Sequence, residues 1–230
     1  MTNPILNTII KRRWLYCCLL FFSACFQKSP PANTVINNND SLLQEKNIAA
    51  AMDSIFYYKK LVKQGDLILR TGRDFTSETF RQLSAHDKTY SHCGIASIEH
   101  DSVFVYHAIG GEWNPDQKLR RDPFEFFCNP YENRGFGIFR YKLSAQQNNN
   151  LSNEVKNLYR QSVMFDMQFD LATDNRMYCS EFVYKAITRA THDAVVIPVS
   201  VAYNKKFITT DDLFLNPWCS EVKRIKFQTQ

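Results

Sequence analysis

The spacing of apolar residues along the chain predicts both helices and strands. Between residues 41 and 62 apolar positions recur near every third or fourth residue, which is typical of a helix, and Gln64 and Gly65 end it. The same spacing predicts further helices over 77–85, 151–163 and 179–190. Short runs rich in β-branched and aromatic residues predict strands over 66–70, 93–98, 103–108 and 137–141. Because only the polar residues 99–102 separate the second and third of these runs, we expect them to pair as a hairpin.

One long stretch, residues 110–135, follows neither spacing. It contains three prolines and is predicted to be rich in loops, and whether it closes over a site stays open. Its aromatic residues are interpreted as core packing rather than as the lining of a cleft, because buried aromatic side chains dominate cores. They are Trp113, Phe124, Phe126 and Phe127.

The first 24 residues have the pattern of a secretory leader. Three basic residues at 11–13 precede the apolar run 14–22, and small residues follow. The run is too short to cross a hydrocarbon layer, which needs about 20 apolar residues. The segment Phe22-Ser23-Ala24-Cys25 resembles a bacterial lipobox, in which the cysteine carries the lipid and becomes the mature N-terminus. We therefore predict a lipoprotein signal peptide with Cys25 as the lipidation site; a plain secretion signal and an uncleaved anchor are the alternatives.

Residues 25–40 have the composition of a flexible tether. They are polar, contain two prolines and offer few apolar side chains for a core. The folded domain is then predicted to span 41–230. Together, the leader and the tether predict a protein of the bacterial cell envelope, periplasmic or associated with the outer membrane. We expect it to be attached to the membrane through the N-terminal lipid. Which leaflet holds the lipid stays open.

Composition and charge exclude several classes of protein. Hydrophobic residues make up 44% of the 230 residues and charged residues 22%, values that argue against a disordered, collagen-like or solenoid chain. The net charge is +5, and it falls to +2 without the three basic residues of the leader. Because no arginine-rich stripe remains in the body, we expect no nucleic-acid partner. The oligomeric state stays open.

Four cysteines lie beyond the leader and the lipidation site. They are Cys93, Cys128, Cys179 and Cys219. None has the spacing of a C-x-x-C or zinc-finger motif, so no metal and no cofactor is predicted. A disulfide among Cys93, Cys128 and Cys219 is compatible with a location outside the cytoplasm, but spacing alone assigns no pair.

Cys179 is distinguished by its place at the start of a predicted helix. It precedes Phe182 and Val183, the first residues of the apolar stripe, by three and four positions, so it lies in the first turn on the buried face. The positive end of the helix dipole and the unpaired amide hydrogens there favour a thiolate, which is the form that acts as a nucleophile. The alternative is an inert buried cysteine, which is common in cores.

His92 and His107 lie on the two strands of the predicted hairpin. His92 shares a face with Gly94, and a loop of even length puts His107 on that same face, opposite or diagonal, ~5–8 Å away at the backbone. One imidazole can then take a thiol proton while the second fixes the tautomer of the first. Two ordinary half-buried histidines are the alternative.

Four segments together resemble the motifs of NlpC/P60 peptidases. They are Gly65-Asp66-Leu67-Ile68, Ser91-His92-Cys93-Gly94-Ile95, Val105-Tyr106-His107-Ala108 and Cys179-Ser180-Glu181-Phe182-Val183. In that superfamily the cysteine motif normally comes first, whereas here it comes last. This order is similar to the circularly permuted papain-like group, the YaeF/YiiX-type amidases, and the resemblance covers residues 60–190. One departure is His107, where that type has glutamate and where the related lecithin–retinol acyltransferase kind has histidine.

The resemblance implies an α+β domain of the permuted papain-like type, with a small antiparallel sheet packed against helices. It implies a Cys179 nucleophile, a His92 base and a His107 that orients the base, with the Cys179 amide among the donors to the oxyanion. Tyr178 and Asp170 are candidates for shaping that region. The expected function is a thiol hydrolase, an amidase or peptidase acting on peptidoglycan-type peptides or N-acyl compounds. Acyl transfer or deacylation of lipids, and a non-catalytic envelope lipoprotein, are the alternatives.

Overall fold

The computed structural model describes residues 38–229, apart from 112–113 and 203–204. The predicted signal peptide, the lipidation site Cys25 and most of the predicted tether lie outside the described residues, as does Trp113. In the part of the chain that is described, no helix combines the length and the apolar character needed to cross a bilayer.

The described chain alternates between helices and strands. The helices are α2 (Asn38–Lys59), α3 (Phe75–Leu83), α4 (Phe124–Phe127), α5 (Ala145–Arg160), α6 (Cys179–Thr191) and α7 (Thr210–Phe214). The strands are β1 (Leu67–Gly72), β2 (His92–Glu99), β3 (Ser102–His107), β4 (Arg120–Pro123), β5 (Asn133–Tyr141), β6 (Ser200–Ala202), β7 (Lys205–Phe207) and β8 (Cys219–Lys226). Every helix and strand predicted from apolar spacing is present, most of them within a few residues of the expected bounds.

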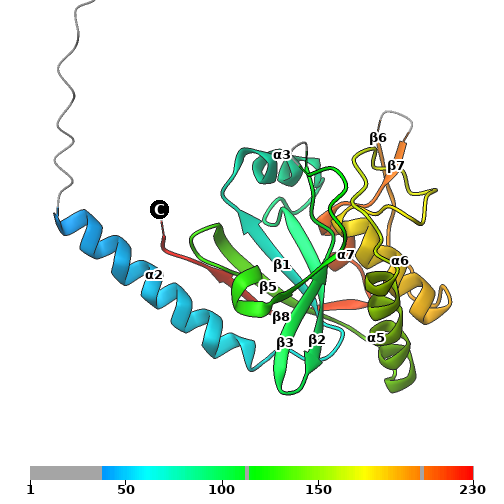
Figure 1. The fold of residues 1–230 in the computed structure, drawn as a ribbon, viewed down its shortest axis with the longest axis horizontal. Helices are drawn as coiled ribbons and strands as arrows, with labels where there is room; N and C mark the ends of the chain where they lie inside the picture. The colour runs from blue at the N-terminus through cyan, green and yellow to red at the C-terminus, as the bar shows by residue number, and fades with distance from the viewer. Residues whose placement is uncertain (1–37, 112–113, 203–204, 230) are drawn as a thin grey trace, which may run out of the picture. The chain divides into compact units, whose positions relative to one another are not determined.

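Six of the strands form one sheet, in the order β4-β3-β2-β1-β5-β8. Each neighbouring pair is antiparallel, and β6 and β7 form a separate two-stranded ribbon. Helices pack against the sheet (Figure 1). The predicted α+β class with an antiparallel sheet is therefore confirmed.

Helices cover both faces of the sheet, and Figure 1 shows α2 on one side and α5 and α6 on the other. On the α2 side, Ile68, Val105 and Ile138 pack with residues of α2 and α4. On the α6 side, Leu69 and Cys93 pack with residues of α5 and α6. Because side chains alternate along a strand, consecutive residues of β2 contribute to opposite layers of the core.

The β2–β3 hairpin closes through a two-residue turn. Glu99 pairs with Ser102, and His100 and Asp101 between them have φ angles of 47° and 64°. Two left-handed residues in succession match the right-handed twist of the flanking strands. The turn thus has the even length that puts His92 and His107 on one face.

Helix α5 begins six residues before the expected start. The side chain of Ser144 accepts a hydrogen bond from the Gln147 amide, and the Gln147 side chain caps the Ser144 amide in return. This capping box satisfies two free amides and extends the helix through the polar residues 146–150. Apolar spacing alone marks only the part from Leu151 onwards, where Leu151, Val155 and Leu158 are buried.

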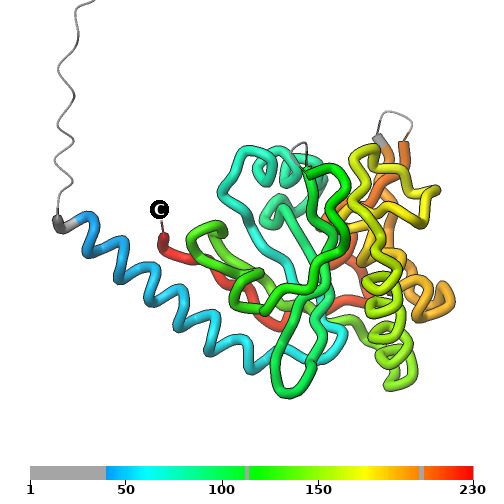
Figure 2. The backbone as a smooth tube through the Cα atoms, viewed as in Figure 1, coloured from blue at the N-terminus to red at the C-terminus, as the bar shows by residue number. Residues whose placement is uncertain are grey.

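The elements that apolar spacing did not predict are short or lie at the edges of the sheet. β4 and β8 are the two edge strands, and both carry several charged residues, a common way of protecting an edge from further pairing. The chain after β8 runs beside α2, where the Asn47 side chain donates to the Gln228 carbonyl at 3.1 Å (Figure 2).

Candidate active site

The hairpin brings the two predicted histidines into direct contact. His92 Nε2 lies 2.8 Å from His107 Nδ1, and both rings face the α4 side of the sheet. Ile95 is paired with Tyr106, so His92 and His107 are diagonal neighbours on one face, as expected. The predicted juxtaposition of these two residues is therefore present in the structure.

A third residue, which the sequence did not indicate, extends this contact. Asp122 of β4 lies diagonally across from His107, and its Oδ2 is 2.9 Å from His107 Nε2. Arg120 also contacts the carboxylate of Asp122, at 2.9 Å. We call His92, His107 and Asp122 the relay. Asp122 was missed because β4 is a four-residue charged strand inside the loop-rich stretch 110–135.

The hydrogen bonds of the relay determine which ring nitrogens carry hydrogen. An ionised Asp122 can only accept, so His107 Nε2 donates to it and His107 Nδ1 carries a lone pair. His107 Nδ1 therefore accepts from His92 Nε2. The remaining nitrogen of His92, Nδ1, is then unprotonated and is the proton acceptor of the relay. His92 keeps 8% of its surface exposed while His107 keeps 1%, so it is His92 that reaches the surface.

Two neighbours fix the rings in place. A Cβ on Gly94 would lie 2.6 Å from the Tyr106 carbonyl and 3.0 Å from the His107 Cβ, so β3 approaches β2 closely only because position 94 is glycine. On the other side, the ring of Phe127 packs 5.6 Å from His92 and 5.0 Å from His107. Phe127 is buried, as expected for core packing, and it also forms the floor beneath both imidazoles.

Burial keeps both histidines neutral near neutral pH. It lowers the pKa of His92 well below the ordinary 6.5, and the positive charges of Arg70 and Arg120 lower it further. Burial also lowers the pKa of His107 to about 4, although its hydrogen bond to Asp122 acts in the opposite direction. Burial of Asp122 favours its protonated form, but the contacts with His107 and Arg120 outweigh this and lower its pKa. A neutral imidazole is the form that accepts a proton.

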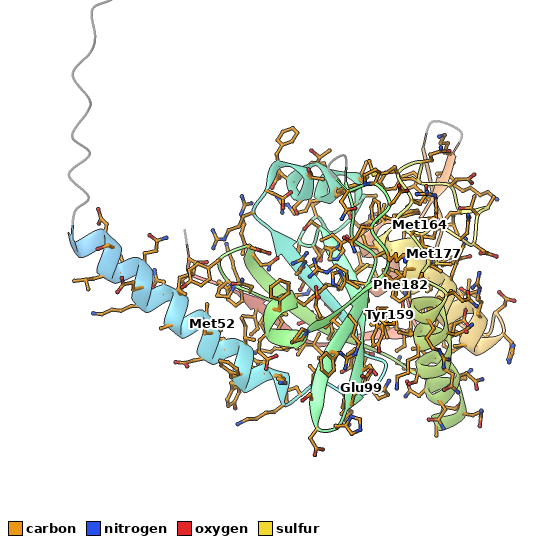
Figure 3. All side chains as sticks on the ribbon, viewed as in Figure 1. Met52, Glu99, Tyr159, Met164, Met177 and Phe182 are labelled. Carbon is orange, nitrogen blue, oxygen red and sulfur yellow. The ribbon has the colours of Figure 1, made fainter. Side chains whose placement is uncertain are left out.

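Cys179 is the first residue of α6, and its neighbours explain why the helix begins there. Tyr178 is extended, with φ −84° and ψ 173°, and its amide donates to the Glu181 carboxylate at 3.2 Å. Phe182, labelled in Figure 3, is fully buried in the core on the α6 side of the sheet. The thiol of Cys179 is consequently held at the positive end of a 13-residue helix and is partly exposed.

Hydrogen bonds stabilise the thiolate form of Cys179. The Cys93 thiol is the main donor, and the backbone amides of Ser180 and Cys93 also donate to the sulfur. Together they lower the pKa of Cys179 below 9, against the effect of burial. Burial and the same contact raise the pKa of the Cys93 thiol well above 9. Cys93 is thus a donor to the Cys179 sulfur, a contact that its sequence position did not reveal.

Cys179 and His92 both lie near the beginning of β2. Cys179 contacts Cys93, and His92 is the preceding residue and the first of the strand. The side chains of His92 and Cys93 point to opposite faces, so Cys179 packs on the α6 side of the sheet and the His92 ring on the α4 side. Among the described residues no hydrogen bond joins the Cys179 thiol to His92.

The two tentative candidates for the oxyanion region have other contacts. The Tyr178 hydroxyl accepts the Ile208 amide at 2.7 Å, and its ring packs 4.9 Å from Phe169. The Asp170 side chain is exposed and accepts the Ala172 amide at 3.0 Å in a turn. These contacts position the segment that leads into α6.

Arg70 is a further residue beside the site that the sequence did not indicate. It is paired with His92 across β1 and β2, and its guanidinium carbon lies 4.9 Å from the centre of the Phe127 ring. Its charge lowers the pKa of His92 and interacts with a Cys179 thiolate.

Cys93, Cys128, Cys179 and Cys219 all carry free thiols, so none of the disulfides compatible with the sequence is formed.

Comparison with known proteins gives one informative likeness. No protein-family model matches the sequence, and no curated protein matches it significantly. Among solved structures, the metalloprotein YiiX from Escherichia coli O157:H7 is similar, with a TM-score of 0.58 and 20% sequence identity. The match covers 71% of this chain and 98% of that protein. The chain therefore has a YiiX-like fold, which is consistent with its six-stranded antiparallel sheet packed against helices.

Proposed function

We propose that this protein is a thiol hydrolase of the cell envelope that cleaves amide bonds, with Cys179 as the nucleophile and His92 as the base. The observation that carries the proposal is the relay, because its hydrogen bonds leave His92 Nδ1 as an acceptor at the start of the strand that the Cys179 thiol contacts. A nucleophile, a base and an orienting group are the three parts of a cysteine hydrolase.

The reaction follows from these roles. His92 Nδ1 takes the thiol proton while the sulfur of Cys179 bonds to the carbonyl carbon and an electron pair moves onto the oxygen. When the carbonyl re-forms, the C–N bond breaks and the protonated His92 gives its proton to the leaving nitrogen. A water molecule then attacks the thioester while His92 takes its proton, the C–S bond breaks to release the acid, and protonated His92 returns the proton to the sulfur.

The start of α6 offers a donor for the oxyanion. The Cys179 amide is in the first turn, where no carbonyl of the helix can accept from it. In the described residues it donates to no backbone carbonyl elsewhere. The positive end of the helix dipole also lies at this amide, so negative charge on the substrate's carbonyl oxygen would be stabilised by groups that are already in position.

The location and substrate class rest on the leader and on the fold. A lipidated Cys25 and a tether would anchor the domain in the envelope, and peptidoglycan-type peptides and N-acyl compounds are the amide substrates that we propose there. The YiiX-like fold supports the permuted NlpC/P60 assignment that the order of the motifs suggests.

A metal centre does not fit the residues of this site. YiiX is described as a metalloprotein, but the described residues of this chain include no group of three His, Cys, Asp or Glu side chains arranged to hold a metal ion. Within the relay, both nitrogens of His107 are engaged by its neighbours. We therefore derive no step through a metal.

The test is incubation of the full-length protein with peptidoglycan fragments and, separately, with phospholipid vesicles. We expect new amide cleavage products with the native protein and none with Cys179→Ala. Cys219→Ala, which changes a cysteine on the far edge strand, is the matched control and should retain activity. Lipid products in place of peptide products would favour the acyl-transfer alternative. If neither substrate changes and a thiol-directed probe does not label Cys179, the proposal is wrong.

A further inference from the structure

Arg70 is held beside the relay by aromatic and backbone contacts. It lies directly opposite His92 in the β1–β2 pairing, on the same face of the sheet. Its guanidinium stacks on Phe127, the ring that also supports both histidines, and its Nη1 donates to the Phe127 carbonyl at 3.2 Å. The side chain is partly exposed, so a ligand can reach it.

Arg70 differs from the other arginines of the sheet because no carboxylate pairs with it. Arg120, Arg121 and Arg140 each form an ion pair, with Asp122, Glu99 and Asp66 respectively. Within the described residues Arg70 has no such partner, and its Nε is buried without any hydrogen bond. The nearby carboxylate of Asp122 is already shared by His107 and Arg120.

A partly buried guanidinium that lacks a carboxylate partner is a binding site for an anion. Burial of a charge without a counter-ion is unfavourable, and proteins normally pair such charges or use them to bind ligands. Arginine presents a planar set of donors that matches the two oxygens of a carboxylate. Because Arg70 lies opposite His92 in the β1–β2 pairing, an anion bound by its guanidinium lies beside the proposed base.

We infer that Arg70 determines substrate specificity by binding a carboxylate of the substrate next to the scissile amide. The inference rests on the proposed function and narrows its substrate class to acidic peptides or N-acyl amino acids. A carboxylate that engages Arg70 fixes the substrate relative to Cys179. It also supplies the counter-ion that Arg70 lacks among the described residues.

The test compares two alkylating reagents that differ only in charge. In each, the Cys179 thiolate displaces iodide from a CH₂ carbon; iodoacetate carries a carboxylate and iodoacetamide a neutral amide. The rate of each reaction at Cys179 is measured by peptide mass spectrometry on the full-length protein, folded and in urea. We expect the ratio of the iodoacetate rate to the iodoacetamide rate to be about tenfold higher in the folded protein, because a nearby positive charge favours the anion.

Three variants distinguish a specific effect of Arg70 from a general effect of the protein's positive charge. Arg70→Met should lose the preference for iodoacetate, and Arg70→Lys should keep part of it. Arg121→Gln removes the same charge but acts at the other end of the hairpin, where Arg121 pairs with Glu99 at 2.6 Å (Glu99 is labelled in Figure 3), and it should change nothing. If circular dichroism shows that Arg70→Met does not fold, the ratio of the iodoacetate rate to the iodoacetamide rate in the native protein and in Arg70→Lys tests the inference instead.

The outcomes distinguish this inference from the proposed function. If Cys179 of the folded protein is alkylated readily but shows no preference for iodoacetate, or if Arg70→Met keeps the preference, the role of Arg70 is wrong and the thiol hydrolase stands. If Cys179 reacts with neither reagent, the proposed function fails and the role of Arg70 fails with it.

Discussion

Asp122 ends the chain of hydrogen bonds that begins at His92, and its ionised carboxylate decides which nitrogen of each ring carries hydrogen. The side chain accepts from His107 at 2.9 Å and is held by Arg120 at the same distance. Asp122 does not touch the reacting atoms, so it is a positioning residue. Its effect on His92 passes through His107.

Replacing this carboxylate by an amide tests its positioning role. Asp122→Asn can present an N–H to His107, which would reverse the tautomers and leave hydrogen on His92 Nδ1. We expect kcat to fall by about a hundredfold or more, within the range that general-base catalysis supplies, while KM changes little. ¹⁵N NMR of the histidine rings measures the tautomers directly.

Asp116→Asn is the matched control, because Asp116 is an exposed partner of Arg176. It should leave both kcat and the ring spectra unchanged. A normal kcat in Asp122→Asn, or a lower kcat with native tautomers, would contradict the role assigned to Asp122.

Prediction from the sequence succeeded for residues whose partners lie on predicted elements. His92 and His107 could be paired because strand periodicity and an even turn fix their faces. Asp122 and Arg70 could not be found in this way, because their roles depend on which strands become neighbours. The contact of Cys93 with Cys179 joins residues 86 positions apart and is equally invisible to local patterns.

At the scale of elements, the site depends on how closely β3 approaches β2. The Gly94 backbone faces the Tyr106 carbonyl and the His107 side chain at distances that leave no room for a methyl group. The close approach sets the distance between the two imidazoles.

Gly94→Ala should therefore disturb both the sheet and the relay. We expect the free energy of unfolding to fall by about 1–3 kcal/mol, as for other overpacked positions, and kcat to fall because His107 is displaced. Urea unfolding and steady-state kinetics measure the two effects. Gly111→Ala is the control, because nothing lies within 4 Å of a Cβ built there, and it should match the native protein. Equal stability and activity of Gly94→Ala would show that the close packing is unimportant.

Elements with a clear apolar spacing were predicted, and elements defined by edges or caps were not. β4 and β8 alternate charged and apolar residues too weakly to indicate a strand, and they form because β3 and β5 offer unpaired edges. The early start of α5 depends on a single serine cap. In both cases tertiary pairing or capping determines the structure, and the spacing of apolar residues gives no information about either.

On the scale of the whole molecule, each of the two layers of the core buries a titratable group, and burial shifts their pKa values in opposite directions. His107 lies on the α4 side of the sheet and is 1% exposed, whereas Glu181 is a residue of α6 and is 0% exposed. Burial lowers the pKa of His107 to about 4 and raises that of Glu181 to about 7. Stability is consequently expected to decline on both sides of an intermediate pH.

The acid side of this profile is assigned to the buried histidines. As pH falls from 6.5 towards 4, the unfolded chain binds a proton that folded His107 does not, so stability is lost across this interval. His107 alone should account for about 3 kcal/mol of this loss. His107→Gln should reduce the difference in unfolding free energy between pH 7 and pH 4, measured by urea denaturation. An unchanged difference would show that His107 does not titrate as its burial requires.

Glu181→Gln should change the pH dependence of the unfolding free energy in the opposite direction, and it serves as the control. Because the folded-state pKa of Glu181 is raised, its contribution is complete below pH 4.5 and is lost as pH rises through about 7. The variant should lose less stability than the native protein between pH 5 and pH 8, and it should keep the native acid loss.

The fold as a whole was predicted through the order of four motifs and not through composition. The motifs mark β1, the two strands of the hairpin and the start of α6. The likeness to YiiX at 20% identity confirms the fold to which they belong. Substrate and activity are not contained in that likeness, because they depend on side chains in the site.

The central claim is that Cys179 is an activated nucleophile, and the pH dependence of its alkylation tests this most directly. Rates of reaction with iodoacetamide are measured at each cysteine of the full-length protein by peptide mass spectrometry between pH 5 and pH 10. Burial raises the pKa of Cys93 and of Cys128, and that of Cys219 to about 12, so these thiols are internal references. We predict that Cys179 reacts fastest, with a midpoint clearly below pH 9. A Cys179 that is as unreactive as the other three, or that titrates at or above pH 9, would contradict the account.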